Sequence, residues 1–457
     1  MKNKEIAPPS FFKKRARTFI PAAVAAIVWL FLKICLDNHF VNWDDFDYVL
    51  ANPLIKDVSW DGLKEIFSTP VMGNYQPLTI LGYAIEYSYV SYEPWLYHLN
   101  SLLLHIAVTL LVYWFTQALT RRWVVAAITA LLFGLHPMHM ESVAWVSGRK
   151  DELCALYYIA SCLAFLYYTR SHSGRWRWYA ITMLMFFCAV LSKPTAVMLP
   201  PVLLLIDYFD GRDWSKNIFV EKIPFFILSV IFGIISLKTQ SAVGTVNIQG
   251  LHYSALERMA LGGYAMVTYL WKAVFPAHLC CFYPYPSKIN GALPLTFYIY
   301  PVVVAALLFI VFKYARRSKI IIFGLLFFAV NICFLLQFIP VGSAIYADRY
   351  TYIPYLGLFL IAGWFVAPYF ENLQKPFSRP VVVITLCCVI SLGYFSYERC
   401  RVWYNPLSLW TDELKKEPGV AAAYVSLGSV YYDLWQNATD PVEKQAMYDS
   451  AFYLMKT

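Results

Sequence analysis

Two adjacent aspartates, Asp44 and Asp45, lie in a stretch of the sequence that is rich in carboxylates. Between positions 37 and 93 there are nine acidic residues and only two lysines. A carboxylate can take a proton from a hydroxyl group, and two neighbouring carboxylates can divide the roles of base and orienting group. We therefore predict that Asp44 and Asp45 are catalytic. A solvated acidic loop without a reaction would have the same composition.

Four basic residues lie at the ends of apolar segments that we expect to face outward, where basic side chains are uncommon. They are Arg149, Lys150, Lys193 and Arg349. Arg and Lys are the usual partners of phosphate groups, so we predict that these four bind an anionic headgroup at the membrane surface. Two alternatives stay open: a lysine that extends to the membrane interface, or ion pairs with the neighbouring Asp151 and Asp348.

Polar residues also gather in the segment 136–151, where lipid would disfavour them. His136, His139 and Glu141 could bind a divalent metal, but their spacing is not a recognised zinc pattern and Pro137 interrupts the helix. We therefore predict that they line a polar cavity, because ionisable groups at membrane depth are usually functional. Asp151 and Asp348 are expected to line the same cavity.

The composition indicates the elements that must position these residues. The chain has 457 residues, of which 60% are hydrophobic and 14% charged, as expected for a polytopic membrane protein. We predict an all-α bundle of about eleven transmembrane helices. The apolar runs cover residues 19–36, 99–119, 123–140, 153–169, 178–192, 195–209, 219–237, 295–312, 320–339, 354–370 and 380–397. A further run at 256–275 contains two glycines and a lysine, and we interpret it as interfacial or re-entrant.

The net charge of +9 does not indicate nucleic-acid binding, because most basic residues lie at the ends of alternate apolar runs, as the positive-inside rule requires. The basic N-terminus, residues 1–18, is therefore predicted to be cytoplasmic. An odd number of spans places the first loop, residues 37–98, and the C-terminal segment on the outer side. Most of the ten cysteines fall inside apolar runs, where cysteine behaves as a small apolar residue.

Three parts are expected along the chain: residues 1–18, a transmembrane domain over 19–400, and a segment of helices over 401–457. The last segment contains Leu427, Gly428 and Tyr431 at the spacing of the opening half of a tetratricopeptide repeat. A single repeat cannot bury its apolar face alone, which predicts further repeats or a partner. In the first loop, residues 60–67 are predicted to form a short amphipathic helix.

Several motifs occur in a specific order. They are Trp43-Asp44-Asp45, His136-Pro-x-His-x-Glu-Ser-Val, Gly148-Arg149-x-Asp151, Ser192-Lys193 with Leu205-x-Asp207, and Asp348-Arg349-x-x-Tyr352-x-Pro354. Together with the repeat-like C-terminus, they resemble the transmembrane and tetratricopeptide-repeat (TMTC) protein O-mannosyltransferases and their bacterial relatives, within the C-type (GT-C) glycosyltransferases. The resemblance covers nearly the whole chain.

The resemblance implies inverting transfer of a sugar, such as mannose, from a polyprenyl-phosphate carrier to an acceptor, often a Ser or Thr hydroxyl. The expected base is an acidic residue of the first outer loop, Asp44 or Asp45. The expected partners are a lipid-linked sugar, a protein or glycan acceptor that the C-terminal repeats could bind, and membrane lipids; no cofactor is certain. The short loops favour a bacterial inner membrane over the endoplasmic reticulum. The alternatives are a membrane-anchored repeat scaffold and a transporter.

Overall fold

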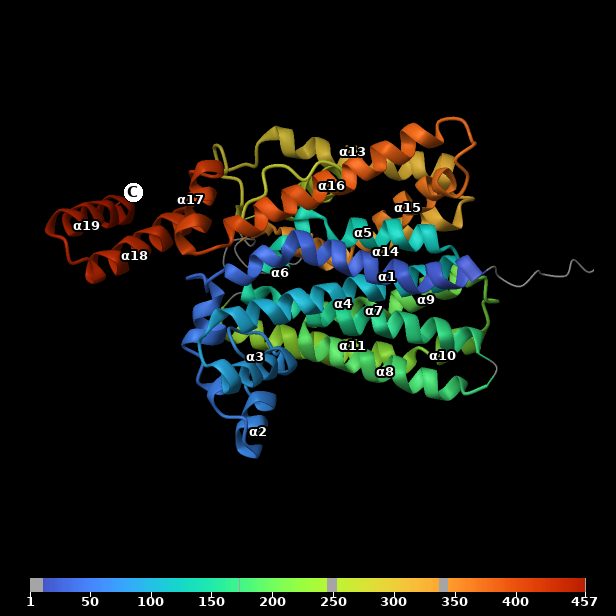
Figure 1. Cartoon of the computed structure of the whole chain (residues 1–457), viewed down its shortest axis with the longest axis horizontal. Coiled ribbons are helices and arrows are strands. Elements are labelled where there is room, and N and C mark those ends of the chain that lie inside the picture. The colour runs from blue at the N-terminus through green and yellow to red at the C-terminus, as the bar shows by residue number, and fades with distance from the viewer. Residues whose placement is uncertain (1–10, 172, 245–252, 337–343, 457) are drawn as a thin grey trace, which may run out of the picture.

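The computed structural model describes residues 11–171, 173–244, 253–336 and 344–456, and of residues 11–18 it describes only the backbone. Long helices run side by side along the main axis of the molecule, and the C-terminal helices project from one end (Figure 1). Two short strands, β1 (Tyr283–Pro284) and β2 (Ala344–Tyr346), pair antiparallel between loops. The predicted helical bundle is confirmed for the described part of the chain.

Each predicted apolar run lies on or overlaps a helix. These helices are α1 (Phe11–Leu32), α4 (Pro94–Thr120), α5 (Trp123–Gly134), α7 (Arg149–Arg170), α8 (Arg175–Ser192), α9 (Leu199–Asp210), α11 (Ile223–Ala242), α13 (Ile299–Ile310), α14 (Lys319–Ile332), α15 (Tyr355–Glu371) and α16 (Ser378–Val402). Within the described ranges, six helices are long and apolar enough to cross a membrane, and a bent pair would make seven. The count of eleven spans therefore stays a prediction.

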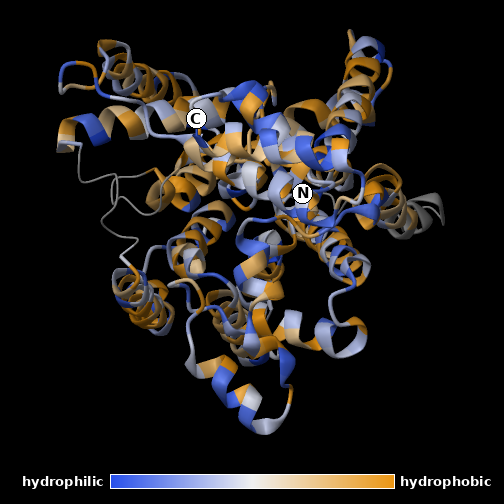
Figure 2. Cartoon of the chain, turned by 90° about the vertical axis from the view of Figure 1, so that its left-hand side faces the viewer, coloured by the Kyte–Doolittle hydropathy of each residue, from blue (hydrophilic) through white to orange (hydrophobic). Residues whose placement is uncertain are grey.

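Seen from the end that carries the first loop, apolar residues run along the helices and hydrophilic stretches gather in the loops facing the viewer (Figure 2). This distribution is that of a protein embedded in lipid, whose helix surfaces stay apolar. The apolar run at 256–275 forms α12 (Ala255–Lys272), which packs closely on α13. A Cβ atom on Gly263 would lie 2.9 Å from the backbone nitrogen of Pro301, so only glycine fits there. The interfacial or re-entrant character of α12 stays a prediction.

The first loop folds into a small unit with a core of its own. It contains α2 (Trp60–Ser68), which covers the predicted amphipathic helix, and α3 (Pro77–Val90). The hydroxyl of Ser59 accepts a hydrogen bond from the Gly62 N–H and so caps α2. The members of the core are Tyr48, Val49, Leu54, Ile55, Ile66, Ile80, Tyr83, Ala84, Tyr97 and Val146. Since Val146 precedes α7, the loop is packed onto the bundle.

The segment between α5 and α7 is bent and fully buried. Pro137 ends the regular helix, and the following α6 (Met140–Ala144) turns away from α5, so that the two directions differ by 55°. Gly148 then passes so close to this turn that a Cβ would lie 2.8 Å from the carbonyl oxygens of Glu141 and Ser142. The bend therefore exposes polar groups of the segment to the interior of the bundle rather than to lipid.

The C-terminal segment consists of α17 (Pro406–Lys416), α18 (Ala421–Asn437) and α19 (Pro441–Lys456). The short helix α10 (Lys216–Val220) lies at the opposite end of the molecule (Figure 1). Helices α18 and α19 pack as a hairpin, in which a Cβ on Gly428 would lie 2.9 Å from Met455. Such close packing is compatible with a tetratricopeptide-type helix pair, and the assignment stays a prediction.

Candidate active site

Asp45 is an anchor of the first loop. Its carboxylate accepts hydrogen bonds from the backbone N–H of Val41 (3.0 Å), the backbone N–H of Ser147 (2.9 Å) and the Ser147 hydroxyl. The residue is only 1% exposed. Burial raises the pKa of Asp45 to about 6, although the three hydrogen bonds work in the opposite direction. Asp45 therefore fixes the loop to the segment before α7 and leaves the carboxylate next to it available.

Asp44 lies beside this anchor in a different environment. Its side chain is 20% exposed, and its nearest charged partner is the ammonium group of Lys150 at 3.4 Å. No backbone donor binds its carboxylate among the contacts of the described residues. Of the two aspartates, Asp44 is thus the one that a substrate hydroxyl group can reach.

Three cations and three carboxylates form one group around Asp44, which we call the polar cluster. It consists of Asp44 with Lys150, Asp151 with Lys193, and Glu141 with Arg349. The backbone N–H of Arg349 also donates to Glu141, at 2.8 Å. All three cations keep between 11% and 17% side-chain exposure, so each is accessible at one edge.

Two aromatic rings hold these pairs together. The face of Trp145 lies 5.2 Å from the Lys150 ammonium and 5.4 Å from the Arg349 guanidinium. The ring of Tyr350 lies 5.2 Å from Arg349 and 5.8 Å from Lys193. Cations bind favourably over aromatic faces, and rigid rings position them without neutralising them. The arrangement gathers three cations in one region, each beside its own carboxylate, and leaves Asp44 accessible.

Arg149 does not join the polar cluster. Its guanidinium is buried and forms an ion pair with Glu86 of α3, and it also donates to the carbonyl oxygen of Tyr97. The ring of Tyr83 covers it at 4.9 Å. The geometry therefore favours a structural role for Arg149, in which it joins α7 to the first loop, over the predicted contact with a phosphate.

Asp348 points away from its neighbour Arg349. The hydroxyl of Tyr283 donates to Asp348 at 2.8 Å, and the ammonium of Lys272 lies 3.5 Å away. Asp348 thus belongs to a second buried group, between α12 and the β1–β2 pair. The alternative pairs weighed from the sequence, in which Asp151 and Asp348 neutralise the arginines beside them, do not form in the structure.

Both histidines of the 136–139 turn are buried and bonded to backbone carbonyls. His136 contacts the carbonyl oxygen of Ala273 at 3.3 Å, and His139 contacts that of Phe133 at 2.8 Å. In the described ranges, no group of three His, Cys, Asp or Glu side chains is arranged to bind a metal ion. His139 packs on Tyr352, whereas His136 reaches a groove on the other side of the turn.

Sequence reasoning missed several residues that shape this region. Trp145 bridges two cations, Glu86 neutralises Arg149, and Asn42 binds the C-terminal segment. It also missed Arg399, in the last turn of α16, at a helix end that we expect to face outward. Arg399 breaks the positive-inside pattern as the four selected cations do, so the same signal could have identified it.

The comparisons with known proteins agree with the predicted resemblance. Residues 91–238 match the family model described as dolichyl-phosphate-mannose-protein mannosyltransferase. A protein O-mannosyl-transferase of Caenorhabditis elegans is 25% identical over 87% of this chain and 58% of its own length. Human TMTC3, also named a protein O-mannosyl-transferase, is 22% identical over 96% of this chain and 51% of its own length. Mouse TMTC2 is 34% identical over 30% of this chain and 17% of its own length. The chain thus spans about half the length of the relatives that it matches throughout.

Two solved structures cover most of the chain at low identity. ArnT from Cupriavidus metallidurans, bound to undecaprenyl phosphate, gives a TM-score of 0.43 at 15% identity, over 96% of this chain and 76% of ArnT. The oligosaccharyltransferase of Archaeoglobus fulgidus gives 0.47 at 14% identity, over 98% of this chain and 60% of that enzyme. On the sequence matches and the order of its motifs, the chain is a TMTC-like integral membrane protein, similar over most of its length to protein O-mannosyl-transferases.

Proposed function

We propose that this protein is a membrane glycosyltransferase that moves a hexose, such as mannose, from a polyprenyl-phosphate carrier to a hydroxyl group of a protein. The names of its relatives support transfer of mannose to proteins. The observation that carries the proposal is the accessible carboxylate of Asp44 beside three cations held on aromatic rings. An inverting sugar transfer uses a base for the acceptor proton and positive charge for the departing phosphate.

In the proposed reaction, the acceptor oxygen attacks the anomeric carbon from the face opposite the phosphate. Asp44 takes the hydroxyl proton as the new carbon–oxygen bond forms. The bond between the anomeric carbon and the phosphate oxygen breaks, and its electron pair stays on the departing phosphate. Arg349, Lys193 and Lys150 stabilise that developing charge, because cations at fixed positions act most strongly where charge appears. Asp45 positions Asp44 through its three hydrogen bonds.

The first loop and the C-terminal segment lie at the same end of the bundle, which supports one compartment for both (Figure 1). We propose that this compartment is the outer side, with residues 19–400 as the transferase domain and 401–457 as the start of a repeat region that approaches the acceptor. The short loops favour a bacterial inner membrane.

The test is transfer in a reconstituted system. The purified chain in liposomes is given radiolabelled mannosyl or glucosyl polyprenyl phosphate and peptides that contain Ser and Thr. Transfer by the wild type but not by Asp44→Asn supports the proposal, and the preferred carrier identifies the sugar. Absence of transfer from every carrier, with peptide binding to residues 401–457 retained, would favour the scaffold alternative.

A further inference from the structure

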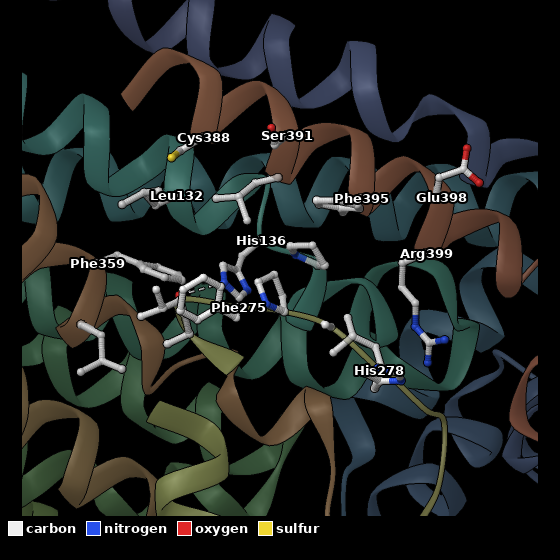
Figure 3. A pocket seen from close by; sticks show the side chains of 18 of the residues that line it. Leu132, His136, Phe275, His278, Phe359, Cys388, Ser391, Phe395, Glu398 and Arg399 are labelled. Atoms are coloured by element: carbon white, nitrogen blue, oxygen red, sulfur yellow. Dashed lines mark hydrogen bonds between the residues drawn. The ribbon is translucent and has the colours of Figure 1, made fainter. Parts of the chain in front are cut away.

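A groove opens on the side of the bundle, between α5, α12, α15 and α16, with a volume of about 870 Å³ (Figure 3). Most of its lining is apolar, including Leu132, Leu270, Phe359 and Leu392. Several apolar residues that line it are exposed: Val274 and Phe275, which follow α12, and Phe395 of α16. We call this feature the lateral groove. It is large and apolar enough to accept hydrocarbon chains.

One end of the lateral groove is cationic. Arg399 and Lys416 both line it, and Figure 3 shows Arg399 and His278 at that end, with Glu398 above them. Arg399 is only 5% exposed, and its Nη1 donates to Asp412 at 3.0 Å. The ammonium of Lys416 donates to the same carboxylate at 2.7 Å. Two cations therefore share Asp412, while Glu398, which also lines the groove, pairs with Arg401 at 3.5 Å.

The guanidinium of Arg399 is incompletely bonded. Its Nε and Nη2 atoms are buried and have no hydrogen-bond partner among the described residues. Unmade hydrogen bonds of a buried charged group are costly, and native structures seldom leave them. The edge formed by Nε and Nη2 matches the spacing of two phosphate oxygens, which it can bind with two parallel hydrogen bonds. Since Arg399 lines the groove, a rotation of its side chain would present this edge to a headgroup there.

We propose that the lateral groove binds an anionic phospholipid of the membrane, with its chains in the groove and its phosphate on Arg399. The carrier of the proposed reaction fits less well, because the phosphate of a sugar donor must lie next to the reacting carbon and hence near Asp44. Trp403, whose ring lies 5.9 Å from Arg399, stacks on Trp145 at 5.6 Å, and Trp145 contacts the polar cluster. Two indole rings thus separate Arg399 from that cluster.

The proposal is independent of any sugar transfer, so lipid binding alone tests it. Delipidated full-length protein is mixed with phosphatidylglycerol or phosphatidylcholine, and bound lipid is counted by native mass spectrometry. The wild type should prefer phosphatidylglycerol by at least tenfold. Arg399→Gln should lower phosphatidylglycerol binding by roughly ten- to a hundredfold, the loss expected for hydrogen bonds to a charged group. Arg401→Gln, which changes an exposed arginine on the same helix, should bind as the wild type does.

A second variant keeps Arg399 and its pair with Asp412. Ser391 lines the groove from α16, so Ser391→Trp should fill it and reduce binding of both lipids. Its matched control is Ile390→Trp, since Ile390 is exposed on the same helix and does not line the groove. Equal binding of the two lipids by the wild type would overturn the proposal, as would unchanged phosphatidylglycerol binding in Ser391→Trp. Displacement of phosphatidylglycerol by an equal amount of polyprenyl phosphate would reassign the groove to the carrier.

Discussion

The polar cluster and the lateral groove both contain cations, but they treat the charge differently. In the polar cluster each cation faces its own carboxylate, as Arg349 faces Glu141. At the groove, Arg399 and Lys416 share Asp412, and two nitrogen atoms of Arg399 have no partner among the described residues. The charges of the polar cluster therefore neutralise one another, whereas the lateral groove keeps two N–H groups of Arg399 without an acceptor in the described part of the chain.

From this difference we expect an anion to bind tightly at Arg399 and only briefly in the polar cluster. A phosphate that enters the polar cluster must compete with carboxylates already in place, so it is held moderately and can leave after reaction. A phosphate at Arg399 satisfies donors that otherwise stay unpaired, so its binding should be persistent. Turnover suits the first behaviour, and a resident lipid suits the second.

The largest expected effect is the loss of the base. Asp44→Asn should lower sugar transfer by about 10² to 10⁴, the usual contribution of a general base, while donor binding stays nearly unchanged. The rate of radiolabel transfer to a peptide measures this effect. Asp47→Asn is the matched control, because Asp47 is an exposed carboxylate in the same turn and should be neutral. Full activity of Asp44→Asn, alone and combined with Asp45→Asn, would exclude catalysis by this loop.

The second prediction concerns the pH dependence that Asp45 imposes on stability. Burial raises the pKa of Asp45 from 3.8 to about 6, which corresponds to about 3 kcal/mol between the charged and neutral forms. Because the folded-state pKa is the higher one, the contribution of Asp45 to stability should be fully present below about pH 4. Stability should fall as the pH rises through about 6 and then level off.

Thermal unfolding of detergent-solubilised protein between pH 4 and 8 measures this slope. Asp45→Asn should lack it, and should also lose the bond from Val41, since an amide offers one acceptor oxygen instead of two. Asp47→Asn should retain the slope of the wild type. Parallel curves for Asp45→Asn and the wild type would show that this carboxyl group does not control the stability of the loop.

The third prediction separates a cation of the polar cluster from a structural one. Arg349→Ala should weaken donor binding by roughly ten- to a hundredfold, and Arg349→Lys should recover only part of it because lysine lacks the planar fork. Arg149→Ala should act on folding instead, since it leaves Glu86 buried without its partner, at a cost of about 3–5 kcal/mol. Donor affinity and the unfolding temperature of both variants distinguish these outcomes. A selective loss of donor affinity in Arg149→Ala would restore its predicted phosphate contact.

The sequence predicts the helices well and the ion pairs poorly, for a physical reason. Apolar runs report burial or lipid contact directly, so each of them falls on a helix. Ion pairs depend on which distant segments meet. Residues two apart on a helix, such as Arg149 and Asp151, do not face each other. Their partners, Glu86 and Lys193, lie 63 and 42 positions away along the chain.

The candidate site shows the same limit. The carboxylates and cations could be selected because their types are unusual at outer helix ends, and most of them do meet in one cluster. The sequence leaves the division of roles between Asp44 and Asp45 open, because it depends on Ser147, which approaches from the segment before α7. Arg149 lies outside the polar cluster because it pairs with Glu86 of α3, and the sequence does not show that these two residues meet.

The smallest effect should come from the contact between the first loop and the C-terminal segment. Asn42 donates to the carbonyl oxygen of Ser426 at 2.9 Å and to the Ser429 hydroxyl at 3.0 Å, and it accepts from the indole N–H of Trp410 at 2.7 Å. Asn42→Ala should lower the transfer rate by about three- to tenfold, because it removes hydrogen bonds that together contribute about 1 kcal/mol to the position of the first loop. The donor KM should stay unchanged.

Ser429→Ala, which removes only one acceptor, should have a weaker effect than Asn42→Ala. Steady-state rates with a saturating acceptor peptide measure both variants. If Asn42→Ala were as inactive as Asp44→Asn, the C-terminal segment would be an essential part of the polar cluster. If it were fully active, the contact would be only a point of attachment.

The packing of the first loop also sets an order for biogenesis. The loop emerges from the ribosome directly after α1, but Val146 completes its core, and Asp45 and Glu86 find their partners only at Ser147 and Arg149. Until α7 has been inserted, the loop therefore carries an exposed apolar surface and two carboxylates that lack their partners at Ser147 and Arg149. During translation it should be a client for chaperones in its compartment, and truncation before residue 150 should leave it sensitive to proteases.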